Sequence, residues 1–324
     1  MKKSVAAFAL ASVSALVLAG CASGSEAGGS DDGLIQVTAS TNVYGSLVAQ
    51  IGGDRVEVAS IITSASQDPH SYEASARDRL GVQNADLVIE NGGGYDAFID
   101  TLLDGSDAHV LTAVEFSHDF PGNEGHDEEA EHDHDHAEGE EGHEGHNHIE
   151  GFNEHIWFDP HTMIHVVEGI ATELTELDPE GEAEFAAAAD EIIAELESIE
   201  TDLETLAADA DGAAVFITEP LPGYIATAAG LTDVAPDGFA AAVEEGSDVA
   251  PATLLDALDV IDTGDVAVVL TNAQTGGSET QRVEDAAEAA GIPVVAFTEL
   301  LEDGSSYAKW MRDAIQNLAD ALQS

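Results

Sequence analysis

Basic residues are scarce in this chain of 324 residues, which carries 8 Lys and Arg against 65 Asp and Glu and a formal net charge of -57. Such a surface repels phosphate backbones, so the composition excludes nucleic acid as a partner. The same charge concentrates cations near the protein. Salt adaptation or general solubility accounts for most of the charge, so only a more specific pattern can argue for a bound metal.

Cysteine is almost absent, because Cys21 is the only one in the chain. No intrachain disulfide is therefore possible, and the fold must be held by its core. Cys21 closes the sequence LAGC after two lysines and a short apolar run. This pattern predicts a bacterial lipoprotein signal peptide over residues 1–20, with lipidation at Cys21 as an anchor to the cell membrane. No other segment is apolar for long enough to suggest a membrane span.

Strands and helices alternate after a Gly, Ser, Asp and Glu tether at residues 21–33. The expected strands lie near residues 35–39, 56–63, 86–90 and 109–114 in the first half, and near 213–218, 266–271 and 294–298 in the second. The expected helices lie near 44–51, 74–83, 95–103, 160–177, 182–207, 223–229, 251–261, 280–290 and 307–322. This order is typical of parallel sheets covered by helices.

Residues 182–207 are rich in Ala, Glu and Leu and have no internal Gly or Pro, which favours one long helix. The length left after a signal peptide suits two lobes better than one core. The sequence therefore predicts an α/β fold of two parallel-sheet lobes, with an N-terminal lobe over residues 34–180, a linking helix over 181–209 and a C-terminal lobe over 210–324.

Candidate ligands follow several of the predicted strands. His70 follows the strand at 56–63, Glu219 the strand at 213–218, and Glu299 the strand at 294–298. His155 precedes a helix start at Asp159-Pro160. Ligands of α/β sheets gather at the carboxyl ends of strands, so these side chains are expected to meet in a cleft between the lobes. Asn272 and Gln274, beyond the strand at 266–271, are candidates to orient them.

Seven histidines lie between two of these candidates, interleaved with Asp, Glu and Gly and without an aliphatic run that could fold. A disordered insertion is therefore expected over residues 122–150. Its imidazoles are candidates for weak, auxiliary metal binding. They are His126, His132, His134, His136, His143, His146 and His148.

Three segments resemble the solute-binding lipoproteins of zinc and manganese ABC transporters, the TroA-like family. They are DPHSYE around His70, NADLV at residues 84–88 with Asn91-Gly92 after it, and His155-Ile156-Trp157. The resemblance implies two lobes bridged by a long helix, with one metal held between them by four side chains. In this family the histidines of the first and third segments are ligands, which places the first two at His70 and His155.

The resemblance also implies the other two ligands. The third family ligand lies five residues before a tyrosine and is usually histidine in zinc members, and here Glu219 lies five residues before Tyr224. The fourth falls on Glu299, with Glu302 and Asp303 as rivals in the same acidic loop. With a carboxylate at the third ligand position, this chain is similar to the manganese-binding members. The histidine-rich insertion and the general affinity order of divalent ions favour Zn²⁺, with Mn²⁺ as the alternative.

The resemblance, together with the signal-peptide pattern, thus implies an extracytoplasmic, monomeric receptor that binds Zn²⁺ tightly and delivers it to an ABC permease and its ATPase. A manganese receptor of the same family and a surface lipoprotein for metal storage or adhesion are the alternatives. A metal-dependent hydrolase is a further rival. We expect no enzyme activity, because four protein ligands leave no position for a reactive water and no general base lies in a recognisable motif.

Overall fold

The computed structural model describes residues 33–123, 149, 151–302 and 304–324. The predicted signal peptide with Cys21, nearly all of the tether, and the seven histidines of the insertion lie outside these residues. Within the described ranges, no helix is both long enough and apolar enough to cross a bilayer.

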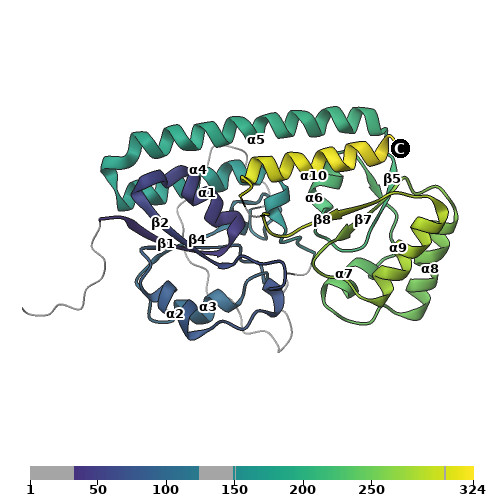
Figure 1. Ribbon diagram of the computed structural model, residues 1–324, viewed down its shortest axis with the longest axis horizontal. Coiled ribbons are helices and arrows are strands. Elements are labelled where there is room, and N and C mark those ends of the chain that lie inside the picture. The colour runs from purple at the N-terminus through teal and green to yellow at the C-terminus, as the bar shows by residue number, and fades with distance from the viewer. Residues whose placement is uncertain (1–32, 124–148, 150, 303) are drawn as a thin grey trace, which may run out of the picture. The chain divides into compact units, whose positions relative to one another are not determined.

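The first lobe contains a four-stranded parallel sheet with the order β2-β1-β3-β4. Successive residues of β3 face opposite cores, since Leu87 and Ile89 pack into one apolar cluster and Val88 into another. Helices therefore cover both faces of the sheet, as Figure 1 shows. The strands are β1 (Ile35–Thr41), β2 (Val56–Ile62), β3 (Leu87–Glu90) and β4 (His109–Thr112), and the helices are α1 (Asn42–Gly52), α2 (Ala76–Gln83), α3 (Phe98–Leu103) and α4 (Pro160–Leu177).

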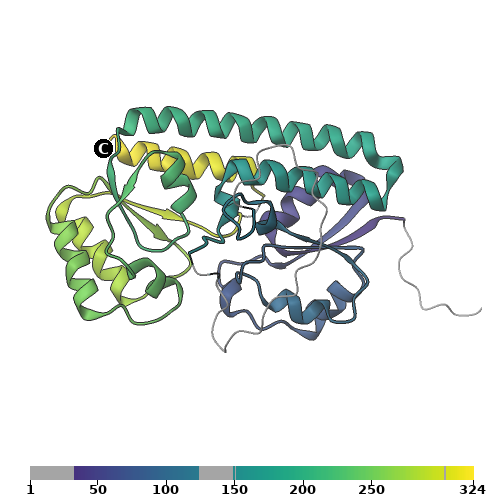
Figure 2. The same ribbon diagram turned by 180° about the vertical axis from the view of Figure 1, so that it is seen from behind.

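The second lobe repeats this plan with a parallel sheet of order β6-β5-β7-β8. Val268 and Leu270 of β7 pack into the larger core, whereas Val269 packs into a separate cluster on the other face. Both faces are again covered by helices (Figure 2). The strands are β5 (Ala214–Ile217), β6 (Thr232–Asp233), β7 (Val268–Asn272) and β8 (Val294–Phe297), and the helices are α6 (Gly223–Ala228), α7 (Phe239–Glu244), α8 (Pro251–Asp262), α9 (Ser278–Ala290) and α10 (Tyr307–Leu322).

The predicted long helix is α5 (Glu182–Ala210), which confirms the two-lobe architecture. At 1.5 Å per residue it is about 44 Å long, and it contacts α1 and α4 of the first lobe and α6 and α10 of the second (Figure 1). Its buried side chains recur every three or four residues and form one stripe, at Phe185, Ala189, Ile192, Leu196, Ile199, Leu203 and Leu206. One continuous apolar seam therefore joins both lobes.

Two predicted helices begin later than expected, and one strand and one helix were missed. The helix expected from residue 95 begins at Phe98, because Gly92, Gly93 and Gly94 all adopt positive φ angles and turn the chain first. The helix expected from residue 74 begins at Ala76, after a capping box between Ser75 and Asp78. No sequence signal was strong enough to predict β6 or α7.

Hydrogen bonds also cross directly from one lobe to the other. The Asn42 side chain donates to the carbonyl of Leu301 at 2.9 Å and accepts from its amide at 3.1 Å. The buried hydroxyl of Tyr307 on α10 donates to the carbonyl of Trp157 at 2.7 Å. Because these bonds involve backbone groups at the junction, the relation between the lobes is specified by polar contacts as well as by apolar packing.

Candidate metal centre

His70 is positioned by the Asp-Pro sequence that precedes it. The Asp68 carboxylate accepts hydrogen bonds from the His70 amide at 3.0 Å and from the Ser71 hydroxyl at 2.7 Å. Pro69 opens the short 3-10 helix η2 (Pro69–Ser71), which follows β2. The His70 ring then meets the buried Tyr95 ring edge-on, with 4.9 Å between the centroids. A local capping motif therefore fixes His70 beyond the carboxyl end of β2.

His155 is oriented by Asn153. Its Nδ1 lies 2.8 Å from the side-chain oxygen of Asn153, which also accepts from the His155 amide at 3.1 Å. The Asn153 amide nitrogen donates to the carbonyl of Pro220 at 3.0 Å, so the oxygen of that side chain is the atom that faces the imidazole. Nδ1 must then carry the proton, and the lone pair of the ring lies on Nε2. His155 is buried, which suits a ligand held in one orientation.

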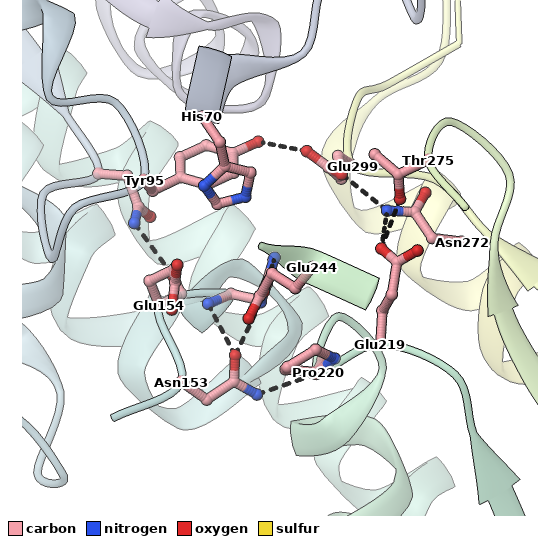
Figure 3. Close-up of polar contacts among 12 residues, drawn as sticks. His70, Tyr95, Asn153, Glu154, Glu219, Pro220, Glu244, Asn272, Thr275 and Glu299 are labelled. Atoms are coloured by element: carbon pink, nitrogen blue, oxygen red, sulfur yellow. Dashed lines mark hydrogen bonds and ion pairs between the residues drawn. The ribbon is translucent and has the colours of Figure 1, made fainter. Parts of the chain in front are cut away.

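Glu219 and Glu299 belong to a single hydrogen-bonded set in the second lobe. They follow β5 and β8, and Asn272 ends β7, which lies between those two strands in the sheet. The Asn272 side-chain nitrogen donates to Glu219 Oε2 at 3.0 Å and to Glu299 Oε1 at 2.7 Å (Figure 3). Both carboxyl groups are almost fully buried, with 3% and 2% of each residue exposed. The carboxyl ends of three strands thus bring these two residues to one place.

Further hydrogen bonds hold the same two glutamate residues in place. The Thr275 hydroxyl donates to Glu219, and the Tyr95 hydroxyl of the first lobe donates to Glu299 Oε2 at 3.0 Å. The side-chain oxygen of Gln274 accepts from the Glu299 amide at 2.7 Å. Asn272 and Gln274 therefore occupy the orienting positions suggested by the sequence, whereas Tyr95 and Asn153 were missed.

One group of closely spaced possible ligand atoms includes a residue that no sequence motif indicated. One ligand atom each of His70, His155 and Glu244 lies within 4.8 Å of the other two. Within the described part of the chain, Glu219 and Glu299 are outside this group, and they stand beside it on the side of the second lobe (Figure 3). The structure thus brings His70 and His155 together, adds Glu244 at the end of α7, and places the two predicted carboxylates next to them.

The rivals of Glu299 in the acidic loop are placed differently. Glu302 is exposed and lines an open surface pocket with residues of α1 and β2. Asp303 lies outside the described residues. Of the positions that the structure describes in this loop, Glu299 is the one whose carboxyl group is buried and hydrogen-bonded to side chains of both lobes.

Negative charge is concentrated and poorly solvated at this centre. Burial raises the pKa of Glu219, and it raises the pKa of Glu299 to about 7. The pKa of Glu244 rises to about 9, mainly through burial and further through repulsion from Glu154, Glu219 and Glu299. Glu244 therefore retains its proton near neutral pH when no cation is present, and Glu299 is about half protonated. A divalent cation can replace those protons and neutralise the cluster, so the arrangement suits cation binding.

Replacing Asn153 with alanine is expected to weaken metal binding, because His155 would lose the acceptor that fixes its tautomer and orientation. Loss of such an orienting partner typically lowers metal affinity by about 10- to 100-fold. Titration under metal-buffered conditions measures the effect. Asn153→Asp keeps an acceptor for Nδ1 and should lose less, while Asn84→Ala, at an exposed helix end, is the matched control. Equal affinities in all three variants would contradict this role for Asn153.

Comparison with known proteins places the chain among metal-binding relatives. The model of a family described as zinc-uptake complex component A, periplasmic, matches residues 37–321. The zinc-binding lipoprotein AdcA of Streptococcus pneumoniae is 29% identical over 194 residues, which cover 59% of this chain and 36% of the relative. The manganese-binding lipoprotein MntA of Halalkalibacterium halodurans is 27% identical over 202 residues, which cover 62% and 58%. The aligned part is thus less than two thirds of either relative.

Solved structures show the same fold. The periplasmic zinc binding protein TroA from Treponema pallidum superposes with a TM-score of 0.69 at 19% identity, covering 90% of this chain and 99% of that one. The solute-binding protein FpvC from Pseudomonas aeruginosa, solved in complex with Mn²⁺, gives a TM-score of 0.67 at 20% identity and covers 90% and 98%. The arrangement of two lobes and a long helix is therefore shared with both.

Proposed function

Because the chain belongs to the periplasmic zinc-uptake component A family, whose members are metal-binding solute-binding proteins and not enzymes, we propose that it is the extracytoplasmic receptor of a metal ABC importer. In this proposal it captures one divalent ion between its lobes and delivers it to a permease and its ATPase. Lipidation at Cys21 would keep it at the cell membrane. The observation that carries the proposal is the gathering of two imidazoles and several buried carboxyl groups from both lobes at one junction.

The ion would be held by His70 and His155 from the first lobe and by Glu219 and Glu299 from the second. The preset tautomer of His155 supports this, since it leaves the lone pair on Nε2, which is the atom that can bind a cation. The hydrogen bonds from Asn272 support it as well, because they hold both carboxylates ready on one side. Protein ligands from both lobes would close the coordination shell, which suits transport of the ion better than hydrolysis.

We propose zinc as the transported ion. Two nitrogen and two oxygen donors bind zinc more tightly than manganese at equilibrium. The relative AdcA is named as zinc-binding, which agrees with this choice. Manganese is the second candidate, since Glu219 supplies a carboxylate at the third ligand position and the relative MntA is named as manganese-binding.

The histidine-rich insertion would raise the local metal concentration without forming the tight site, because ligands that are not held in place pay an ordering cost on binding. Deleting residues 124–148 should leave one tightly bound ion and remove only weak additional sites. The deletion should stop before Ile149, which packs against the core. Calorimetric titration of the full and shortened chains with Zn²⁺, followed by competition with Mn²⁺, tests the function and the metal together. Absence of a tight ion from both chains would refute the proposed function.

A further inference from the structure

We propose that Glu244 is a further ligand of the bound metal, supplied by α7 of the second lobe. This inference rests on the proposed function and adds a residue to its site. Neither the sequence pattern nor the ligand set implied by the family resemblance contains Glu244.

The distance between Glu244 and His155 suits two ligands of one ion. Glu244 Oε1 lies 3.6 Å from His155 Nε2, which is too long for a hydrogen bond. Two donors at about 2.1 Å from a common zinc ion, separated by a tetrahedral angle, lie about 3.4 Å apart. A small adjustment of either side chain would therefore allow both atoms to bind the same cation, and His70 is within the same group.

Glu244 Oε1 and His155 Nε2 face each other, and both are hydrogen-bond acceptors once Glu244 is ionised. The proton of the His155 ring is used on Nδ1 toward Asn153, so Nε2 presents its lone pair to the carboxylate. Within the described residues, Glu244 Oε1 and Glu219 Oε1 are buried and accept no hydrogen bond, whereas Glu219 Oε2 and both oxygens of Glu299 have donors. A buried carboxylate oxygen without a donor is costly. A cation between the two acceptors removes that cost.

Helix α7 holds Glu244 firmly enough to serve as a ligand. Phe239 at its start is fully buried and meets Phe216 of β5 edge-on, with 5.3 Å between the ring centroids. Ala242 and Val243 pack partly against the same cluster. The next residue, Glu245, is exposed, so the helix turns only one of its two adjacent glutamates toward the metal centre.

Adding Glu244 changes the expected donor set to two nitrogens and three carboxylates. A shell of this kind exceeds four-coordination and is richer in oxygen than the four-ligand set. Oxygen donors suit manganese, while zinc accepts a fifth ligand less readily. We therefore expect Glu244 to matter more for the binding of Mn²⁺ than for that of Zn²⁺.

The test uses the full chain with the free metal buffered at low concentration, so that only a tight site fills. Glu244→Gln should lower the affinity for Zn²⁺ by about 10-fold or more, as expected when a ligand of nearly the same shape loses its charge. The affinity for Mn²⁺ should fall further. The matched control is Glu245→Gln, which should bind both ions as the unmodified protein does. Thermal unfolding of each variant without metal checks that the fold is kept, and Glu244→Asp, which retracts the carboxylate but keeps its charge, serves as a second variant.

The visible spectrum of bound Co²⁺ distinguishes direct ligation by Glu244 from electrostatic attraction without ligation. Loss of a ligand from a five-coordinate ion should strengthen the visible absorption bands of bound Co²⁺, because four-coordinate Co²⁺ absorbs more intensely. A lower affinity with an unchanged cobalt spectrum would overturn ligation by Glu244, and so would an unchanged affinity. In either case, if His70→Ala still abolishes tight binding, the receptor function stands. Tight binding retained in His70→Ala would instead refute the proposed function itself.

Discussion

Replacing His70 or His155 with alanine is expected to lower the affinity for Zn²⁺ by about 100- to 1000-fold. Zinc sites with four protein ligands contribute about 10–16 kcal/mol of binding free energy. Divided equally among the four ligands, this is about 3–4 kcal/mol for each. Both imidazoles belong to one group of closely spaced ligand atoms with Glu244, and each is oriented by its own hydrogen bonds or ring contacts. Neither can be replaced by a neighbouring histidine in the described part of the chain, where no third histidine joins that group.

The measurement is a competition titration against a chelator of known affinity, using the chain without residues 124–148 so that the insertion does not contribute. His118→Ala is the control, because the side chain of His118 is 68% exposed and pairs with the exposed Asp119. The affinity of this variant should match that of the unmodified protein. Were His155→Ala to bind Zn²⁺ as tightly as the control, the metal centre would have to be placed elsewhere.

Local signals made much of the fold predictable. Asp-Pro occurs before both His70 and α4, and in both places the aspartate caps the helix that follows while proline opens it. The absence of Gly and Pro from residues 182–207 predicted α5 correctly, since helix propensity accumulates over a long uninterrupted segment. These features depend on neighbours in the chain, so they are visible in the sequence.

Glu244 was missed because its burial depends on tertiary packing. Helix α7 has only six residues and lies among Gly, Pro and Asp, where no periodic pattern marks it. Two adjacent glutamates at its end are typical of a solvated surface. Only the packing of Phe239 against β5 turns one of them inward. The interior role of Tyr95 is hidden for a similar reason, since its partner Glu299 lies 204 residues away in the chain.

The contacts between the lobes suggest how the ion would leave. Tyr95 of the first lobe donates to Glu299 of the second, so a relative shift of the lobes would disturb a ligand directly. Asn153 links the other side of the site, because it contacts His155 and also binds Pro220 and Tyr224 of the second lobe. Helix α5 packs on both lobes and resists wide opening. A small tilt that breaks these few bonds is therefore the expected release motion.

Removing the metal is expected to lower the free energy of unfolding by about 4 kcal/mol relative to protein held at a free metal concentration about 1000 times the Kd. A ligand that binds only the native state stabilises it by mass action. For a chain of this size, with an unfolding entropy of about 2.1 cal/mol/K per residue, the loss corresponds to a fall in Tm of about 7 °C. The ion also neutralises Glu219, Glu244 and Glu299, whose raised pKa values show that burial disfavours their charged forms.

The large negative charge of the chain makes a control for non-specific screening necessary. Ca²⁺ at the same free concentration should reproduce any general effect of a divalent ion on surface repulsion, but it prefers an all-oxygen shell of six to eight ligands and should not fill a site that contains two imidazoles. Calorimetric melting of the unmodified protein should thus show a large shift with Zn²⁺ and a small one with Ca²⁺. In His155→Ala both shifts should be small, because only the screening effect is left. A Zn²⁺ shift of equal size in His155→Ala would mean that stabilisation arises from the acidic surface and not from the centre between the lobes.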